Sequence, residues 1–315
     1  MNDVKHLAFV FPGQGSQKVG MLAEVAEHNS MVASTFTEAS DALGYDLWSL
    51  VQQGPQQKLN MTEITQPALL TASVALWRVW QHAGGANPAL LAGHSLGEWS
   101  ALVCADVIDF SAAVKLVRSR GQYMQEAVPA DVGAMAAIIG LSDEWVEKAC
   151  EQGSSQEAFV SPVNYNSPGQ LVIAGHKAAV EQAMLLCKEA GAKRALPLPV
   201  SAPFHTALMK PAAERLWSEI DATEFRCPTI PVVHNVTAAV ESDPEKIKKL
   251  MVEQIHSAVR WVECVQALAA EGVSATLECG PGKVLSGLSK RIERSLTTFN
   301  IDTIAALESS LAEFQ

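Results

Sequence analysis

The sequence predicts an α/β fold in which a large domain built on a parallel sheet carries a small inserted subdomain. Short apolar runs alternate with helix-like segments along most of the 315 residues, and this alternation favours a parallel sheet covered by helices. Between residues 133 and 200 the expected order becomes strand, helix, strand, strand, helix, strand, which is the ferredoxin-like βαββαβ arrangement. We therefore expect the large domain over residues 1–129 and 203–315, and the ferredoxin-like subdomain over residues 130–202.

The N-terminal part of the large domain is expected to supply two strands of the parallel sheet. Leu7–Phe11 is an apolar run stopped by the glycine-rich stretch Pro12–Gln17, as in a buried strand that feeds a tight loop. A second strand is expected over residues 88–92. Helices are expected over residues 21–27, 31–53, 67–82, 98–105 and 111–125.

The inserted subdomain and the C-terminal part carry cap and turn residues at the expected places. Ser142 precedes two acidic residues as an N-cap does, and Gly191 ends a helix-like segment. Within the insert, strands are expected over residues 133–141, 158–165, 171–174 and 194–200, and helices over residues 142–150 and 177–190. Beyond it, helices are expected over residues 207–220, 243–254 and 262–270, and strands over residues 230–236 and 275–279.

Composition and charge exclude several classes of protein. A hydrophobic fraction of 48% with 18% charged residues is that of a globular chain, not of a disordered chain or a coiled coil. The net charge of −11 argues against nucleic acid as the main partner, because phosphate neutralisation needs clustered Lys and Arg. No apolar run approaches the roughly 20 residues that span a bilayer, and we recognise no secretory signal, so we expect a cytoplasmic protein that binds no membrane. The six cysteines lie far apart without zinc spacing, so we expect reduced thiols and no metal site.

The stretch Gly93-His94-Ser95-Leu96-Gly97 matches G-x-S-x-G, the nucleophile elbow of α/β-hydrolase-like folds. An apolar strand is expected before it and an apolar helix after it, which is the setting that the elbow needs. The glycines leave room for a strained turn, and the serine hydroxyl then projects where amide N–H groups of the helix N-terminus can stabilise an oxyanion. The alternative is a plain turn with a capping serine. The motif favours an α/β-hydrolase-like large domain with Ser95 as nucleophile.

A nucleophilic serine needs a base, and the sequence offers eight histidines. Hydrolase-type folds usually place the base C-terminal to the serine, which directs attention to His205, His234 and His256. His234 lies in an apolar run typical of a packed histidine, and His256 lies among polar residues of a predicted helix. His205 ends a proline-rich loop, a setting that can fix a side chain over a cleft. These contexts favour His205 as the base.

Two further features stay open at the level of residues alone. The loop Pro12–Gln17 lacks the glycine spacing of a nucleotide-binding motif, so it is either a simple turn or the source of a second N–H for an oxyanion hole. Arg118 and Arg120 lie two positions apart on one predicted helix and face different ways. Each is either a solvated or ion-paired arginine, or a bidentate clamp for a carboxylate.

Long motifs in series over nearly the whole chain resemble the malonyl-CoA:acyl carrier protein transacylases of bacterial type II fatty-acid synthesis. The motifs are FVFPGQGSQ (residues 9–17), TQPALLTAS (65–73), GHSLGEWSAL (93–102), RGQYMQ (120–125), GAMAAIIG (133–140), NYNSPGQLVIAG (164–175), PFH (203–205) and GPGKVL (280–285). A small βαββαβ insert is also what this family would have.

The resemblance implies a role for individual residues of this chain. It implies Ser95 as the acyl-accepting nucleophile and His205 as its general base. It implies Arg120 as the clamp for the malonyl carboxylate. The remaining implied residues are Gln14 and Leu96, whose backbone N–H groups would form the oxyanion hole, and Gln254, which matches the position whose backbone carbonyl orients the histidine.

The resemblance also implies the reaction: a ping-pong transfer of the malonyl group from malonyl-CoA to the phosphopantetheine thiol of an acyl carrier protein, through a malonyl-serine intermediate. It implies no cofactor, since malonyl-CoA is a substrate and the carrier brings its own phosphopantetheine. We expect the chain to be a monomer. One alternative is a trans-acting polyketide-type acyltransferase, which differs only in acyl group and carrier. Another is a serine esterase or thioesterase, which uses water as acceptor and usually an Asp or Glu beside the histidine.

Overall fold

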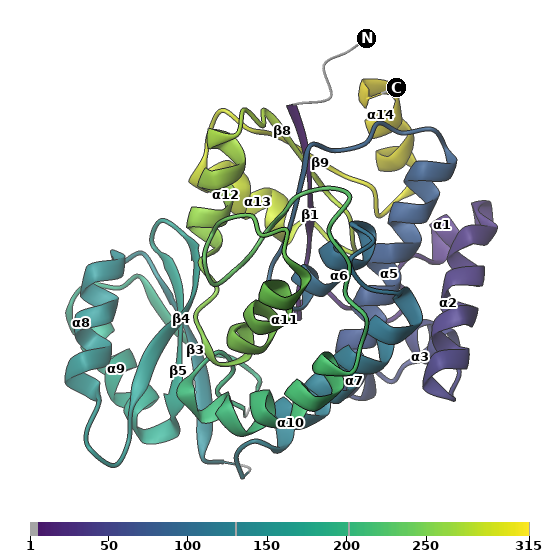
Figure 1. Ribbon diagram of the computed structural model, residues 1–315. Coiled ribbons are helices and arrows are strands. Elements are labelled where there is room, and N and C mark those ends of the chain that lie inside the picture. Colours follow the sequence, from purple (N-terminus) through teal and green to yellow (C-terminus); the bar gives the residue numbers. More distant parts are fainter. Residues whose placement is uncertain (1–5, 130, 201, 315) are drawn as a thin grey trace.

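The computed structural model describes residues 6–129, 131–200 and 202–314, which fold around two separate sheets (Figure 1). The larger sheet has five strands in the order β7-β2-β1-β8-β9, and all neighbouring strands are parallel. The smaller sheet has four strands in the order β4-β5-β3-β6, and all neighbouring strands are antiparallel. The predicted α/β fold with a ferredoxin-like insert is confirmed.

The parallel sheet forms the centre of the large domain. Its strands are β1 (Leu7–Phe11), β2 (Leu90–Gly93), β7 (Val232–Val233), β8 (Ala275–Glu278) and β9 (Thr297–Asn300). All five residues of β1 are buried, because helices cover both faces of a parallel sheet. On one face, the ring of Phe9 meets Trp77 and Trp80 edge-on, with ring centroids 5.2 and 5.4 Å apart. Such edge-to-face pairs add stabilisation beyond the buried area.

Helices pack around this sheet on both sides (Figure 1). They are α1 (Ala23–His28), α2 (Ser30–Leu43), α3 (Leu47–Gln53), α4 (Gln56–Leu59), α5 (Thr62–His82), α6 (Leu96–Cys104), α7 (Phe110–Glu126), α10 (Lys210–Asp221), α11 (Pro244–Glu253), α12 (Trp261–Ala270), α13 (Val284–Ile292) and α14 (Ile304–Phe314). The helical region expected over residues 31–53 consists of two helices, α2 and α3. Gly44 ends α2 in the left-handed conformation, and Asp46 caps α3 by accepting from Ser49 N–H. No helix in the described part of the chain is long and apolar enough to cross a membrane.

The smaller sheet belongs to the segment between α7 and the loop that leads to His205. Its elements are β3 (Gly133–Ile139), α8 (Asp143–Gly153), β4 (Val160–Ser167), β5 (Gln170–His176), α9 (Lys177–Glu189) and β6 (Arg194–Pro197). Both helices cover one face of this sheet (Figure 1) and enclose a core of their own, which includes Val146, Ile173 and Val180. The domain bounds at residues 129/130 and 202/203 stay a prediction.

The departures from the predicted elements include the edge strands of both sheets and the C-terminal part of the chain. β6 stops at Pro197 instead of reaching residue 200, and Pro197 and Pro199 each lack the N–H that a ladder needs. β7 has two residues instead of the seven expected over 230–236. Helix α10 begins at Lys210, after a 3₁₀ turn over Ala207–Met209. No element was expected after residue 283, where the structure has α13, β9 and α14.

Strand register brings together the chain segments that form the site. Phe11, the last residue of β1, is paired with Gly93, the last residue of β2. The loops that follow two adjacent parallel strands therefore leave the same edge of the sheet, where α/β proteins bind their ligands. The smaller sheet is held beside this edge, because Tyr165 N–H donates to Val259 O at 3.0 Å and Val259 N–H donates to Val163 O at 2.8 Å.

Candidate active site

Ser95 lies in a strained turn between the end of β2 and the start of α6. Its φ of 52° and ψ of −108° are rare for a residue other than glycine, so surrounding contacts must hold the turn. Asn235 supplies one of them, because its Oδ1 accepts from Ser95 N–H at 2.7 Å. A Cβ atom on Gly97 would lie 2.0 Å from Phe11 O, so glycine is required where α6 approaches the end of β1. The local structure is thus the strand-turn-helix geometry of a nucleophile elbow.

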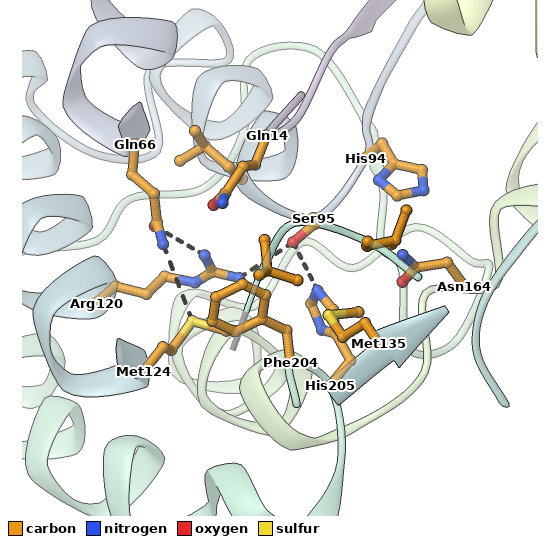
Figure 2. Close-up of a pocket in the computed structure, with 13 residues that line it drawn as sticks. Gln14, Gln66, His94, Ser95, Arg120, Met124, Met135, Asn164, Phe204 and His205 are labelled. Carbon is orange, nitrogen blue, oxygen red and sulfur yellow. Dashed lines mark hydrogen bonds between the residues drawn. The ribbon is translucent and has the colours of Figure 1, made fainter. Parts of the chain in front are cut away.

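His205 lies on the loop that follows the smaller sheet, and its ring points at the Ser95 hydroxyl (Figure 2). Ser95 Oγ lies 2.7 Å from His205 Nε2, although the two residues are 110 positions apart in the chain. The other ring nitrogen, Nδ1, lies 2.8 Å from the backbone carbonyl of Gln254. Because a carbonyl only accepts, the proton of a neutral ring resides on Nδ1 and Nε2 is free to accept the serine proton.

The surroundings of His205 keep its ring neutral. Burial, the largest cause, and the positive charge of Arg120 lower the pKa of His205 from 6.5 to about 3. Its hydrogen bond to the Gln254 carbonyl acts in the opposite direction. At neutral pH the imidazole is therefore unprotonated, which is the form that a general base requires.

Arg120 extends from α7 toward Ser95 and is almost completely buried. Its Nη1 donates to Gln66 Oε1 at 2.8 Å and its Nη2 to Gln254 Oε1 at 2.8 Å, while Nη2 also lies 3.4 Å from Ser95 Oγ. The Nε atom is buried and has no acceptor within the described part of the chain. Burial lowers the pKa of Arg120 to about 10, so the guanidinium remains charged at neutral pH. Arg118, in contrast, is exposed and lies over the ring of Tyr45.

A cavity joins these side chains (Figure 2). Its polar part is lined by Gln14, Gln66, Ser95, Arg120 and His205. Its apolar lining includes Met124, Met135, Leu198, Val200 and Phe204. Met124 lies on α7 of the large domain and Met135 on β3 of the smaller sheet, so both parts of the molecule contribute to the cavity. A reacting group in the cavity would thus meet a nucleophile, a base and a cation among apolar side chains.

Gln14 lies in the loop after β1 and Leu96 at the start of α6, two segments that leave the same edge of the parallel sheet. Both line the cavity. Leu96 is the first residue of α6, so its N–H has no acceptor within the helix. Gln14 follows Gly13, whose backbone passes so close to His94 that an added Cβ would lie 2.5 Å from His94 O. The structure therefore brings all six residues expected at the site into one region, with Gln254 behind His205 and Arg120.

Three buried polar residues of the site were missed by sequence reasoning. Gln66 of α5 holds Arg120, and Asn235, just after β7, holds the elbow through Ser95 N–H and Gly93 O. Glu98 of α6 is 1% exposed and accepts hydrogen bonds from Gln254 and from Asn235 N–H. Glu98 carried one signal, a charged residue inside an otherwise apolar helix. Gln66 lies within the motif TQPALLTAS, which indicated the family but no role for this residue, and Asn235 carried no signal.

The other histidines near the site make different contacts. His94 Nε2 lies 2.8 Å from Asn166 Oδ1, and burial lowers the pKa of His94. His234 is fully buried, as its apolar context predicted, and its Nδ1 lies 2.7 Å from Glu98 Oε1. Among the residues that the structure describes, no group of three or more His, Cys, Asp and Glu side chains has the arrangement of a metal site.

Comparison with known proteins connects this geometry to one family. A family model described as "Acyl transferase domain" matches residues 8–305. The chain is 60% identical to the malonyl CoA-acyl carrier protein transacylase of Salmonella typhimurium, over 97% of this chain and 99% of that protein. It is 59% identical to the protein of the same name from Escherichia coli, over 96% and 98% of the two chains.

Solved structures agree with these sequence similarities. An acyl carrier protein S-malonyltransferase from Vibrio cholerae superposes with a TM-score of 0.94 at 61% identity, covering 96% of this chain and 99% of that one. A malonyl-transacylase in complex with its type II PKS acyl-carrier protein superposes with a TM-score of 0.96 at 56% identity, covering 98% and 99% of the two chains.

Proposed function

Because the chain belongs to the acyl transferase domain family, among its malonyl CoA-acyl carrier protein transacylases, we propose that it transfers the malonyl group of malonyl-CoA to the phosphopantetheine thiol of an acyl carrier protein. One observation carries the proposal: Ser95 Oγ lies 2.7 Å from a neutral histidine nitrogen and 3.4 Å from a buried guanidinium. The nucleophile, the base and the guanidinium that binds the malonyl carboxylate then act within one cavity. The reaction belongs to fatty acid biosynthesis.

In the first half-reaction Ser95 takes the malonyl group from coenzyme A. Its Oγ forms a bond to the thioester carbonyl carbon while its proton passes to His205 Nε2. The tetrahedral intermediate collapses with cleavage of the C–S bond, and the departing thiolate receives the proton from His205 as coenzyme A leaves. The Gln254 carbonyl, which accepts from Nδ1–H, supports the positively charged ring between these steps.

The developing oxyanion needs hydrogen-bond donors placed before the reaction starts. The backbone N–H groups of Gln14 and Leu96 take this role. Leu96 N–H belongs to the positive end of α6, and Gln14 comes from the loop after β1 on the other side of the elbow. One such donor is worth about 2.7–4 kcal/mol of transition-state stabilisation.

Arg120 binds the free carboxylate of the malonyl group. Its Nη1 and Nη2 are held by Gln66 and Gln254, and its Nε has no acceptor among the described residues, which supports a further acceptor from the substrate. An acetyl group has no carboxylate and would leave the buried guanidinium unpaired, a state that costs free energy. The site therefore selects a dicarboxylic acyl group.

In the second half-reaction the carrier thiol replaces coenzyme A. His205 Nε2 accepts the thiol proton, the thiolate attacks the malonyl-serine ester carbonyl, and Ser95 Oγ recovers the proton as the ester C–O bond breaks. The apolar wall around Phe204, Met124 and Met135 limits the access of water, which would hydrolyse the ester. The reaction needs no cofactor besides the phosphopantetheine that the carrier brings.

Carrier proteins are usually acidic, and we propose that exposed cations of this otherwise acidic chain bind the carrier. The candidate cations are Lys193, Arg194, Lys283, Lys290, Arg291 and Arg294, which lie outside the cavity. We assign the chain to the cytoplasm as a monomer. Two carriers should be tested, one from fatty acid synthesis and one from a type II polyketide system. The second is included because the malonyl-transacylase that is 56% identical to this chain was solved in complex with a type II PKS acyl-carrier protein.

Product analysis tests the function under steady-state conditions. The protein is incubated with malonyl-CoA, with and without holo carrier protein, and coenzyme A, malonyl-carrier and free malonate are measured. Coenzyme A release that requires the carrier, with stoichiometric malonyl-carrier, supports the transferase. Coenzyme A release at the same rate without carrier, with accumulation of free malonate, would mean a hydrolase.

A further inference from the structure

Glu98 is a buried carboxylate without a role in the mechanism above. It lies in the first turn of α6, three residues after Ser95, and is 1% exposed. Its Oε1 accepts from His234 Nδ1 at 2.7 Å, and its Oε2 accepts from Asn235 N–H at 3.1 Å and from Gln254 Nε2 at 2.6 Å. Burying a carboxylate costs several kcal/mol unless its oxygens are paired. Three donors on one side chain indicate that the fold is built to hold this charge.

His234 contacts this carboxylate through one ring nitrogen. Its Nδ1 lies 2.7 Å from Glu98 Oε1, whereas its Nε2 is buried without a partner among the described residues. The ring thus meets only Oε1, and Oε2 accepts from the Asn235 N–H and the Gln254 amide.

The side chain of Gln254 connects this carboxylate to the substrate-binding arginine. Its Nε2 donates to Glu98 Oε2, and its Oε1 accepts from Arg120 Nη2 at 2.8 Å. The amide can take only this orientation, because its NH₂ faces an acceptor and its oxygen faces a donor. The same NH₂ also donates to the backbone carbonyl of Ser95 at 2.9 Å. Hydrogen bonds in such a chain polarise one another.

The two ends of the chain carry opposite charges in a region that excludes water. Arg120 and Glu98 are both almost fully buried, and one neutral amide separates them. The negative charge of Glu98 acts against burial and raises the pKa of Arg120. Arg120 Nη1 is fixed separately by Gln66. Gln66 and Gln254 thus fix the orientation of the guanidinium from two sides. Glu98 is the charged group that holds the Gln254 amide in place.

We propose that Glu98 is a positioning residue whose carboxylate, acting through the Gln254 amide, holds the Arg120 guanidinium where it receives the malonyl carboxylate and so sets the preference for malonyl over acetyl groups. The inference rests on the proposed function and deepens it. Loss of the carboxylate charge frees the amide to turn, and the guanidinium then loses its fixed direction. Malonyl transfer suffers more than acetyl transfer, since only malonyl uses the guanidinium.

The test compares Glu98→Gln with a matched change at a second buried glutamate. Glu278 is also fully buried and accepts three hydrogen bonds, but its donors are Leu285 N–H and the N–H and hydroxyl of Ser286, at the start of α13. For each variant, kcat/KM of Ser95 acylation is measured with malonyl-CoA and with acetyl-CoA, together with the free energy of unfolding.

Glu98→Gln is expected to reduce the malonyl-over-acetyl ratio of kcat/KM about tenfold or more. Glu278→Gln is expected to lower stability while the ratio stays within about twofold. An unchanged ratio in Glu98→Gln would overturn the inference, whatever its stability. If Glu98→Gln does not fold, Glu98→Asp is measured instead. The shorter side chain keeps the charge but moves the carboxylate oxygens away from Gln254. The same reduction in the malonyl-over-acetyl ratio is expected.

A double-mutant cycle tests the route through Gln254. Gln254→Met removes the amide but keeps the backbone carbonyl that holds His205. The Glu98→Gln change should lower the ratio by less than about twofold in the Gln254→Met background, because the two residues act in series. Fully additive effects would contradict the route. Wild-type protein that forms no malonyl-Ser95 adduct would instead refute the proposed function, so the two failures are distinguishable.

Discussion

His205 donates its Nδ1 proton to the backbone carbonyl of Gln254, at 2.8 Å. In many serine hydrolases a carboxylate occupies this place and stabilises the imidazolium. Here the orienting group is a neutral carbonyl, which fixes the tautomer without adding a negative charge next to the ring. Burial, and next the positive charge of Arg120, lower the pKa of this ring. In the mechanism that we propose, the protonated ring therefore gives its proton readily to the leaving group.

Removal of the guanidinium tests the specificity of the cavity. Arg120→Ala should lower kcat/KM for malonyl-CoA about tenfold to a hundredfold, because a hydrogen-bonded charge pair is lost, with a much smaller effect on acetyl-CoA. Arg118→Ala is the matched control: it lies on the same helix, two residues away, but is exposed. Acylation rates with both thioesters provide the measurement. Equal losses for the two thioesters would mean that Arg120 does not bind the malonyl carboxylate.

The pH dependence of acylation reports the protonation of His205. Because burial and Arg120 lower the pKa of His205 to about 3, the ring stays neutral as the pH falls through 6.5, the value of a free histidine. With acetyl-CoA as substrate, kcat/KM should therefore stay level between pH 8 and about pH 5.5. In Arg120→Ala the positive charge is gone, so the pKa of His205 rises and the acid limb moves to higher pH. A wild-type acid limb centred near 6.5 would refute this assignment.

The packing of the elbow predicts opposite effects of two Gly→Ala substitutions. Gly97→Ala places a Cβ atom 2.0 Å from Phe11 O, so it should lower the free energy of unfolding by at least about 2 kcal/mol and reduce acylation. Gly287→Ala lies in α13, where nothing is within 4 Å of the added atom. It should raise stability by up to about 1 kcal/mol and leave acylation unchanged. Urea unfolding measures both, and a neutral Gly97→Ala would show that α6 does not depend on this contact.

Charge reversal tests the docking of the acidic carrier. Changing Lys290, Arg291 and Arg294 to Glu should raise KM for the carrier several-fold, and the effect should weaken with added salt. Acylation of Ser95 by malonyl-CoA should be unaffected, since these cations do not line the cavity. Reversal of Lys58 and Lys115, which are exposed elsewhere, is the control. If neither half-reaction changes, the carrier docks on another surface.

The predictable part of the site is encoded in local sequence. A strand, a tight glycine-containing turn and an apolar helix all lie within a few residues of Ser95, so the residue pattern alone predicts the elbow. Proline spacing before His205 indicates a rigid loop in the same way. Arg120 and Arg118 cannot be distinguished by pattern alone, because which of them is buried depends on how α7 packs against α5.

The unpredicted part depends on contacts between distant segments. The backbone carbonyl of Gln254 that holds His205 could come from any residue type, and its side chain contacts Arg120 and Glu98, which are distant in the chain, so only the family resemblance pointed to it. Asn235 follows a two-residue strand that is too short to produce an alternating pattern. The C-terminal strand β9 was missed for a similar reason: its residues, Thr-Thr-Phe-Asn, are partly exposed at the sheet edge and give no apolar run.

The most direct test of the central claim is the intact-protein mass after brief incubation with malonyl-CoA, followed by addition of holo carrier protein. We predict a malonyl adduct on the wild-type chain, no adduct on Ser95→Ala, and a much weaker adduct when acetyl-CoA replaces malonyl-CoA. When the carrier is added, the wild-type adduct should disappear completely and the malonyl mass should appear on the carrier. A malonyl adduct that persists in Ser95→Ala, or the absence of any adduct and any turnover in the wild-type chain, would contradict the account.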